Sequence, residues 1–209
     1  MPRFTGPHDF FDKEYVDHWA EIANSKRPHR AKFFDAFSAE LSRLREPNVL
    51  EIGAGPGFLA EHILARCRVS SYHLLDFSPP MLELARRRLA NFGERVFFHQ
   101  VDFLKENWWQ SFPEKFFDVV VSLQAVHEVR QAEKIAQLYS GVETLVADGG
   151  KIIVADKLDF ETEEGRGELS IQDHESALEQ AGFQGFRRVL EIEDLIMFEA
   201  IKLSASSDD

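Results

Sequence analysis

The sequence predicts an α/β fold in which a mostly parallel β-sheet is covered by helices on both faces. Short, almost continuously apolar runs alternate with segments whose apolar residues recur at helical spacing. Three glycines at alternate positions follow the first apolar run, where a strand would turn into a helix. Two strand-like runs end the chain, and the link between them is so short that they must pair as an antiparallel hairpin.

The expected elements follow one another without an internal repeat. Two helices come first, over residues 12–24 and 28–45, with Pro28 in the first turn of the second helix. The expected strands are residues 49–52, 72–77, 96–101, 117–123, 151–155, 186–192 and 195–202. Helices lie between these strands, and one of them carries Val146 on its apolar face and ends before Gly149 and Gly150. The last helix opens with a capping box formed by Ser170 and Asp173.

Composition and charge limit the kind of protein this can be. The chain has 209 residues, of which 44% are hydrophobic and 29% charged, so it suits one ordinary domain, or one domain with an appended cap, with a buried core. Its net charge of 24 − 36 = −12 opposes binding to a phosphate backbone. Cys67 is the only cysteine, which excludes a disulfide within the chain and a cysteine metal cluster. With no signal-peptide or membrane-span pattern, we expect a cytoplasmic, unanchored protein.

The glycine-rich turn after the first strand predicts a ligand that approaches the main chain. Gly53, Gly55 and Gly57 carry no Cβ atoms that would keep a ligand away from the backbone. A dinucleotide-binding turn would place its third glycine where this chain has Phe58, and a Walker loop would need Gly-Lys-Ser/Thr. The alternative interpretation is a tight turn without a ligand, for which one such glycine would suffice.

Residues 51–57 resemble the first motif of the class I S-adenosylmethionine-dependent methyltransferases, in which an acidic residue and alternating glycines follow the first strand. The resemblance covers roughly residues 45–203 and implies S-adenosylmethionine as the cofactor. It also implies a Rossmann-like three-layer sandwich, with a mostly parallel seven-stranded sheet of order 3-2-1-4-5-7-6, the last strand antiparallel, and additional N-terminal helices. The sequence of residues 75–82 is most similar to that of the small-molecule branch that includes the ubiquinone-biosynthesis methyltransferases.

This resemblance gives a division of the chain and a set of cofactor-binding residues. We expect an N-terminal helical lid at residues 1–46, a methyltransferase domain at residues 47–203 and a disordered tail at residues 204–209. The expected cofactor-binding residues are Glu51, Gly53, Gly55, Gly57, Asp76, Phe77, Asp102, Phe103 and Gln124.

The resemblance also implies individual roles. Asp76 accepts from the ribose hydroxyls, Asp102 accepts from the adenine amino group, and Phe103 lies against the adenine ring. Glu51 organises the methionine ammonium group, and Gln124 contacts the cofactor through its main chain. The alternative role for Asp76 is to cap the following helix.

The loop after the fourth strand carries the catalytic candidate, His127. The reacting groups of open α/β sheets gather at the carboxyl ends of the strands, which places residues 122–128 near the transferred methyl group. An imidazole that titrates near neutrality can accept the proton of a phenol, hydroxyl or amine as the new bond forms. The alternative is a structural histidine that caps the next helix or lines the cofactor pocket.

Together these features predict an enzyme that transfers a methyl group to a small organic molecule, with no nucleic-acid or membrane partner and no metal. Two alternatives stay open: a catalytically silent cofactor-binding or scaffold protein, and a protein or RNA methyltransferase that needs an adaptor subunit. Arg27 and Arg30 suit an anionic substrate or the cofactor carboxylate, the acidic residues from Asp156 onward suit a cationic substrate, and a solvated surface accounts for both groups. The acceptor atom (oxygen, nitrogen, carbon or sulfur) and the choice between monomer and homodimer stay open as well.

Overall fold

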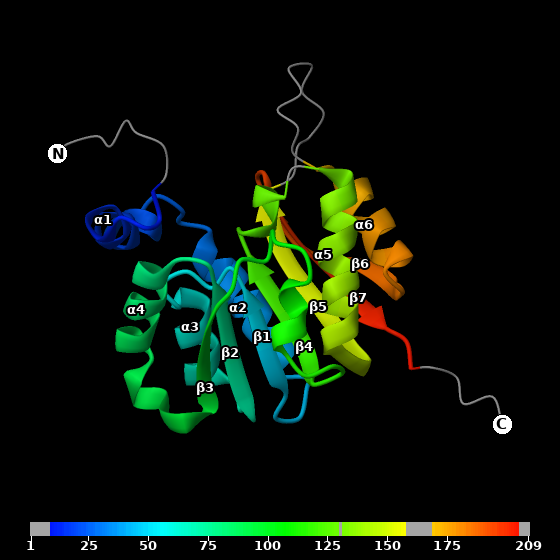
Figure 1. Ribbon diagram of the computed structural model, residues 1–209, viewed down its shortest axis with the longest axis horizontal. Helices are drawn as coiled ribbons and strands as arrows, with labels where there is room; N and C mark the ends of the chain where they lie inside the picture. The colour runs from blue at the N-terminus through cyan, green and yellow to red at the C-terminus, as the bar shows by residue number, and fades with distance from the viewer. Residues whose placement is uncertain (1–8, 130, 158–168, 205–209) are drawn as a thin grey trace, which may run out of the picture.

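The strands form a single sheet in the order that the sequence predicts. The computed structural model describes residues 9–129, 131–157 and 169–204, and within them seven strands pair in the order β3-β2-β1-β4-β5-β7-β6 (Figure 1). The strands are β1 (Asn48–Ile52), β2 (Ser71–Asp76), β3 (Val96–Gln100), β4 (Phe117–Leu123), β5 (Val146–Lys157), β6 (Phe183–Ile192) and β7 (Leu195–Lys202). Strand β7 is antiparallel to both β5 and β6, whereas the pairs from β3 to β5 are parallel. This arrangement confirms the predicted Rossmann-like fold.

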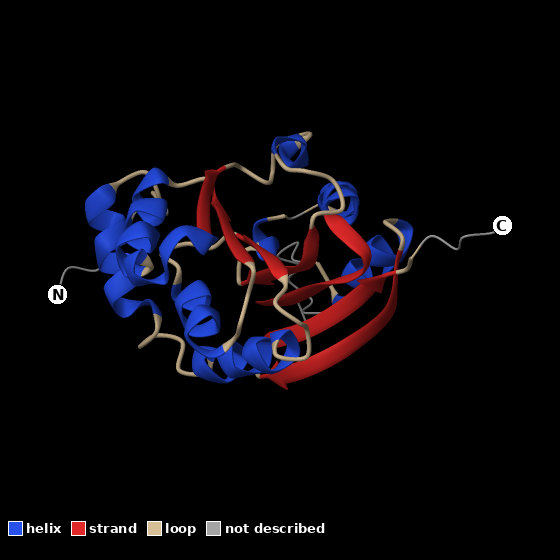
Figure 2. Cartoon of the chain, turned by 90° about the horizontal axis from the view of Figure 1, so that it is seen from below, coloured by secondary structure: helices blue, strands red, loops and turns tan. Residues whose placement is uncertain are grey.

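Helices cover both faces of this sheet, as the view from below shows (Figure 2). The helices are α1 (Lys13–Ala23), α2 (Arg30–Leu41), α3 (Phe58–Arg66), α4 (Pro79–Arg88), α5 (Ala132–Leu145) and α6 (Ile171–Gln180). Shorter 3-10 turns are η1 (Ala90–Arg95), η2 (Trp108–Ser111) and η3 (Val126–Glu128). Helices α5 and α6 pack together over one face, and α2 packs with α3 over the other. Helix α1 contacts α4 at one end of the molecule.

Alternate residues of each central strand enter different cores. In β4, Val120 lies in the core under α5 and α6, whereas Val119 and Val121 lie in the core under α2 and α3. The same alternation separates Ile152 from Ile153 in β5. A strand that is buried on both faces has no polar side, which is why these segments read as continuous apolar runs.

The parallel strands end at one edge of the sheet, and this edge carries the predicted site. Ile52 of β1 pairs with Leu75 of β2, and Leu123 of β4 pairs with Ala155 of β5. The residues that follow β1, β2, β3 and β4 therefore emerge close together, as expected for the ligand-binding edge of an open α/β sheet.

Two predicted boundaries near the N-terminal half of the chain change in the structure. Helix α2 begins at Arg30, because Pro28 lies in the turn before the N-cap residue His29 and not in the first helical turn. The helix ends at Leu41 and not near residue 45. The following Ser42 returns its hydroxyl and its backbone N–H to the carbonyl of Ser38, which closes the last turn.

Strands β5 and β6 are both longer than predicted. Strand β5 begins at Val146, which pairs with Phe117, so Val146 is not part of the helix and Gly149 and Gly150 lie inside the strand. A side chain at Gly150 would come within 2.8 Å of the Asp118 carbonyl oxygen, so this glycine permits close approach of β4. Strand β6 begins at Phe183 and shifts register twice against β7. These shifts interrupt the alternation of apolar and polar residues, so the sequence pattern does not indicate the first residues of the strand.

Several predicted features fall on parts of the chain that are not described. These are residues 1–8 of the expected lid, residues 205–209 of the expected tail, and residues 158–168, which hold most of the acidic stretch that begins at Asp156. The capping box at Ser170 is present, with reciprocal hydrogen bonds between Ser170 and Asp173. No helix within the described ranges is both long and apolar enough to cross a membrane.

Candidate functional site

A cavity of about 350 Å³ opens at the edge where the parallel strands end. Residues from the turn after β1, the ends of β2 and β3, and the turn after β4 form its wall, together with Phe10 and Trp19 from the N-terminal segment. The predicted cofactor residues in this wall are Gly53, Gly55, Asp76, Phe77, Asp102, Phe103 and Gln124. Glu51 lines an adjoining smaller cavity of about 60 Å³, and Gly57 lines neither of the two cavities.

The three glycines of the turn are needed for different reasons. A Cβ atom on Gly53 would lie 2.2 Å from the Cβ of Ala125, so this glycine lets the turn after β1 touch the turn after β4. A Cβ on Gly57 would press on Ala85 of α4 at 3.2 Å. At Gly55 nothing lies within 4 Å of that position, and only here does the missing side chain face open space. The ligand-approach argument therefore applies to Gly55, whereas Gly53 and Gly57 serve packing.

Asp76 ties the glycine turn to the end of β2. Its side chain is 6% exposed, and its two oxygens accept from the backbone N–H groups of Gly55 at 2.7 Å and Ser78 at 2.9 Å. Burial raises the pKa of Asp76, and these backbone hydrogen bonds oppose the rise. Ser78 itself caps α4 by accepting from the Met81 N–H, so Asp76 is not the side-chain cap of that helix. Each carboxylate oxygen has a further lone pair that a ribose hydroxyl could use.

Aromatic side chains form part of the wall of the larger cavity. Phe103 is 8% exposed and lies in the larger core, while Phe77 meets the rings of Phe10 and Phe11 edge-on, with centroids 6.1 and 5.5 Å apart. The Asp102 carboxylate accepts from the Leu104 N–H at 3.0 Å, which holds the loop after β3 in a tight turn. The N-terminal segment thus supplies part of the wall.

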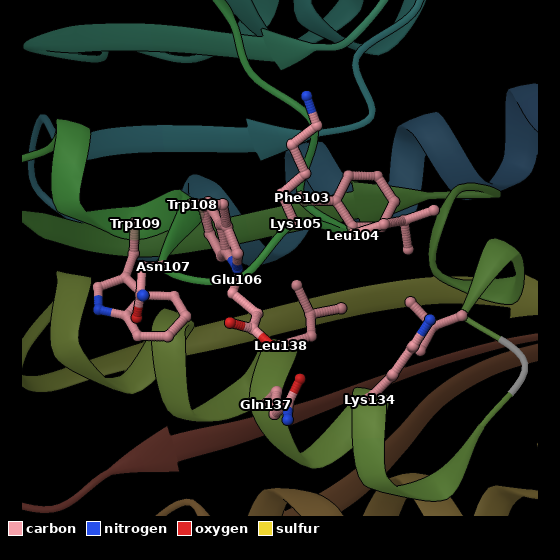
Figure 3. A pocket seen from close by; sticks show the side chains of 11 residues that line it. Phe103, Leu104, Lys105, Glu106, Asn107, Trp108, Trp109, Lys134, Gln137 and Leu138 are labelled. Carbon is pink, nitrogen blue, oxygen red and sulfur yellow. The ribbon is translucent and has the colours of Figure 1, made fainter.

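A separate hollow of about 190 Å³ lies between the loop after β3 and helix α5, beside the main cavity (Figure 3). Phe103 and Leu104 line both spaces, and Lys134, Gln137 and Leu138 of α5 line the far side of the hollow (Figure 3). Phe103 therefore forms a shared wall between the two spaces.

Glu51 is the buried carboxyl group of the smaller cavity. It is 2% exposed, and its Oε2 accepts from the Tyr72 hydroxyl at 2.7 Å. Burial raises the pKa of Glu51 to about 8, although the Tyr72 hydrogen bond and the charge of Arg30 act in the opposite direction. A positively charged ligand group beside Glu51 would favour its ionised form.

Gln124 adopts a backbone conformation that is unusual for a residue with a side chain. Its φ is 54°, and its N–H donates to the Ala155 carbonyl at 2.8 Å. Its side-chain Oε1 is buried and accepts no hydrogen bond within the described part of the chain. A strained backbone conformation of this kind persists when the surrounding structure holds it in place. The buried Oε1 without a hydrogen-bond partner is suited to accept a hydrogen bond from a ligand.

His127 forms a close pair with Asp156, which lies near the end of β5. His127 Nδ1 lies 2.7 Å from Asp156 Oδ1, and the His127 backbone N–H donates to Oδ2 at 2.9 Å. Burial acts against the charged imidazole, but the hydrogen bonds and charges of Asp156 and Glu128 outweigh it and raise the pKa of His127 to about 10. Since Asp156 holds Nδ1, the ring presents Nε2 on its other side.

The structure corrects the expectation that Asp156 belongs to a solvated acidic surface. Its side chain is fully buried, and it holds the loop that carries His127. The sequence signal that could have found this pair is an aspartate at the carboxyl end of the strand next to the His127 loop. His127 itself lines neither of these two adjoining cavities, although its neighbours Ala125 and Glu128 line the larger one.

The site's donors and acceptors suit S-adenosylmethionine. Asp76 and Asp102 supply acceptors at the cavity with the aromatic wall, and Glu51 and the unpartnered Gln124 oxygen supply acceptors next to it. Within the described ranges, no three His, Cys, Asp or Glu side chains gather in a way that would hold a metal ion.

Comparisons with known proteins agree with this interpretation. Residues 49–150, about half of the chain, match a family model described as a methyltransferase domain. A hybrid polyketide synthase–nonribosomal peptide synthetase of Emericella nidulans is 31% identical over 122 residues, which is 57% of this chain and 3% of that protein. The chain thus spans only a small part of the curated relatives it matches.

Solved structures share the fold at low sequence identity. An S-adenosylmethionine-dependent methyltransferase from Mesorhizobium loti superposes with a TM-score of 0.65 at 18% identity, over 80% of this chain and 96% of that one. The carbon methyltransferase CurJ gives a TM-score of 0.64 at 19% identity, over 77% of this chain and 49% of that one.

Fold, site and family model define an enzyme domain of the class I type, in which a Rossmann-like sheet binds S-adenosylmethionine at its carboxyl edge. Residues 49–150 of the chain match the methyltransferase domain, and the chain shares its fold with an S-adenosylmethionine-dependent methyltransferase.

The packing of the glycine turn predicts different effects for two neighbouring substitutions. Gly53→Ala and Gly55→Ala share the strain of a positive φ, but only Gly53→Ala adds a clash with Ala125. We expect Gly53→Ala to lower the free energy of unfolding by about 1–3 kcal/mol more than Gly55→Ala, the usual range for overpacking. Urea denaturation of both variants measures this difference, and equal losses would show that the Gly53–Ala125 contact is not limiting.

Replacing Asp76 is expected to weaken cofactor binding. Asp76→Ala removes a buried acceptor and leaves donors without partners, so we expect binding of S-adenosylhomocysteine to weaken by about 2–4 kcal/mol in calorimetry. Ser78→Ala is the control, because it removes the α4 cap but leaves the Asp76 carboxylate in place. An unchanged dissociation constant in Asp76→Ala would remove Asp76 from the ribose site.

Proposed function

We propose that this protein transfers the methyl group of S-adenosylmethionine to a small organic acceptor, and that His127, held by Asp156, takes up the acceptor proton. The observation that carries this proposal is the His127–Asp156 pair, 2.7 Å apart, in the loop whose neighbouring residues line the cofactor-sized cavity. When bound, the cofactor supplies a methyl group that is already activated on a sulfonium. The protein must then supply alignment and, for a weakly acidic acceptor, a base.

The cofactor residues take the roles that the resemblance implies. We assign the ribose hydroxyls to Asp76, the adenine amino group to Asp102 and the adenine ring to the apolar wall of Phe77 and Phe103. Glu51 faces the methionine end, and residues 53–57 form the turn beneath it. The division into a lid at residues 1–46 and a methyltransferase domain at residues 47–203 is part of the same proposal; Phe10 and Trp19 support it because both line the cavity.

The base is strong because of its buried partner. Asp156 stabilises the protonated imidazole, so His127 must lose a proton before it can accept one from the acceptor. A base with a high pKa is best matched to an acceptor that holds its proton tightly, such as a hydroxyl or a carbon acid. Asp156 also fixes the ring so that Nε2 is the atom that exchanges the proton.

This role gives the reaction a particular dependence on pH. Because His127 is charged below about pH 10, we expect kcat/KM to rise about tenfold per pH unit between pH 7 and 9. His127→Ala should lower turnover by roughly 10²–10⁴-fold while leaving cofactor affinity close to that of the wild type.

Asp156→Asn separates the base from a merely structural histidine. The substitution removes the charge that raises the pKa of His127, so the rise in kcat/KM should level off at a lower pH than in the wild type. Glu128→Gln is the comparison variant. The Glu128 carboxylate also raises the pKa of His127, but its contact with Nε2 is longer, at 3.5 Å, and its side chain is half exposed, so we expect a smaller shift of the profile than in Asp156→Asn. Profiles of the same shape in wild type and Asp156→Asn would contradict the proposed base.

The relatives favour carbon as the acceptor atom. The curated relatives include polyketide synthases, and one structural neighbour is a carbon methyltransferase. A carbon flanked by carbonyl groups is a weak acid that needs a strong base, which agrees with the pairing of His127 and Asp156. A 1,3-dicarbonyl compound is therefore the first surrogate acceptor to try, with a phenol and a primary amine as alternatives.

Transfer of label tests the proposed function directly. The protein is incubated with methyl-labelled S-adenosylmethionine and separate small-molecule, RNA and protein fractions, and we expect label in the small-molecule fraction alone. Label in RNA or protein would indicate the adaptor-dependent alternative. Cofactor binding in calorimetry without label in any fraction would indicate a catalytically silent protein, and NAD binding with no response to S-adenosylmethionine would exclude both.

A further inference from the structure

The hollow between the loop after β3 and helix α5 has an apolar floor, and the proposed function assigns no role to it. The buried residues that line it are Phe103, Trp108, Val129 and Leu138. Its volume of about 190 Å³ is larger than that of an apolar cavity of about 150 Å³ that can hold benzene. The hollow therefore has room for one aromatic ring with small substituents.

Trp108 brings a hydrogen-bond donor without a partner to this hollow. Its side chain is 4% exposed, and Nε1 is buried and donates to no acceptor within the described part of the chain. A Cβ atom on Gly141 would lie 3.1 Å from Nε1, so the indole N–H lies over a residue of α5 that has no side chain to accept from it. A buried donor without a partner costs free energy unless a ligand or a water satisfies it.

Lys134 brings a positive charge to the opposite end of the hollow. Lys134 and Gly141 both belong to α5 and are two helical turns apart, about 10.5 Å along the helix axis. Figure 3 shows Leu138 between Lys134 and Trp108. Lys134 is exposed and forms no ion pair with any residue that the structure describes. The two ends of the hollow thus present a cation and an N–H donor, and both require an acceptor.

Glu106 determines which kind of acceptor suits the Trp108 end. Its side chain lines the hollow, and Figure 3 shows its carboxylate on the Trp108 side of Leu138. A second carboxylate at this end would be repelled by Glu106. A hydroxyl group would not be repelled, because it can accept from the indole N–H and donate to the Glu106 carboxylate. Lys105 also lines the hollow, but its ammonium group points away from α5 (Figure 3).

We propose that this hollow binds a single aromatic ring that carries a carboxylate at one end and a hydroxyl group at the opposite ring position. The carboxylate pairs with Lys134, the hydroxyl accepts from Trp108 Nε1 and donates to Glu106, and the ring lies against Leu138. The inference goes beyond the proposed function, because it assigns a second ligand site outside the larger cavity. Since Phe103 lines both spaces, a ligand in the hollow lies beside the larger cavity without occupying it.

The test compares three ligands that differ by one group each. 4-Hydroxybenzoate carries both groups, benzoate lacks the hydroxyl, and 4-hydroxybenzamide lacks the charge. Titrations followed by ligand-observed NMR give the dissociation constants, with and without saturating S-adenosylhomocysteine to fill the larger cavity. We expect the protein to bind 4-hydroxybenzoate about 3–10-fold more tightly than either of the other two ligands, the usual effect of one hydrogen bond or one exposed ion pair. S-adenosylhomocysteine should leave this binding in place.

Substitutions at the two ends should remove different preferences. Lys134→Met should abolish the preference for 4-hydroxybenzoate over the amide and keep the preference for the hydroxyl. Trp108→Phe, which keeps an aromatic ring, should have the opposite effect. Glu106→Ala changes an exposed position and should also reduce the preference for the hydroxyl, so it tests the same end if Trp108→Phe does not fold. Lys32→Met is the matched control, since Lys32 is exposed on α2 and does not line the hollow.

Three results would overturn this inference. The first is the absence of saturable binding of 4-hydroxybenzoate to the wild type. The second is loss of binding with S-adenosylhomocysteine, which would place the ligand in the larger cavity. The third is an unchanged order of the three ligands in Lys134→Met. None of these measurements requires methyl transfer, so the inference can fail while label transfer is observed, and it can hold where label transfer is absent.

Discussion

Two buried carboxylates hold the functional edge of the sheet together, and each does so by accepting backbone hydrogen bonds from the turn of a neighbouring strand. Asp76 at the end of β2 holds the Gly55 N–H after β1, and Asp156 near the end of β5 holds the His127 N–H after β4. The residues before these aspartates take part as well, because the Leu75 and Ala155 carbonyls accept from Gly53 and Gln124. A buried aspartate and the carbonyl group of the residue before it thus fix each turn. The first residue of each turn, Gly53 or Gln124, has a positive φ.

This arrangement explains how charged groups persist inside the site. A buried carboxylate needs hydrogen-bond donors, and backbone N–H groups at a tight turn supply them in fixed positions. Asp156 has a second use for its charge, because it stabilises the protonated form of His127. Glu51 lacks such backbone donors among its described hydrogen bonds and has the Tyr72 hydroxyl instead, which agrees with its raised pKa.

The fold could be predicted from the sequence because both faces of the central strands are buried, which leaves a strong apolar signal, and because the glycine turn marks the first strand. The strand boundaries at Val146 and Phe183 could not, since glycines and register shifts interrupt the pattern there. The positions of Asp76 and Gly55 could be predicted because each directly follows or ends an apolar strand in the sequence. The His127–Asp156 pair and the burial of Arg30 depend on contacts between segments far apart in sequence, and single-chain patterns do not contain that information.

The contact between Gly53 and Ala125 has a consequence for how such a site can change. The turn after β1 and the loop after β4 touch so closely that a Cβ atom on Gly53 would lie 2.2 Å from the Cβ of Ala125. A larger residue in either would displace the other, so the two segments must vary together. Redesign of the loop after β4 would therefore displace the glycine turn unless residue 125 stayed small, and directed libraries for this scaffold should vary positions 53 and 125 together.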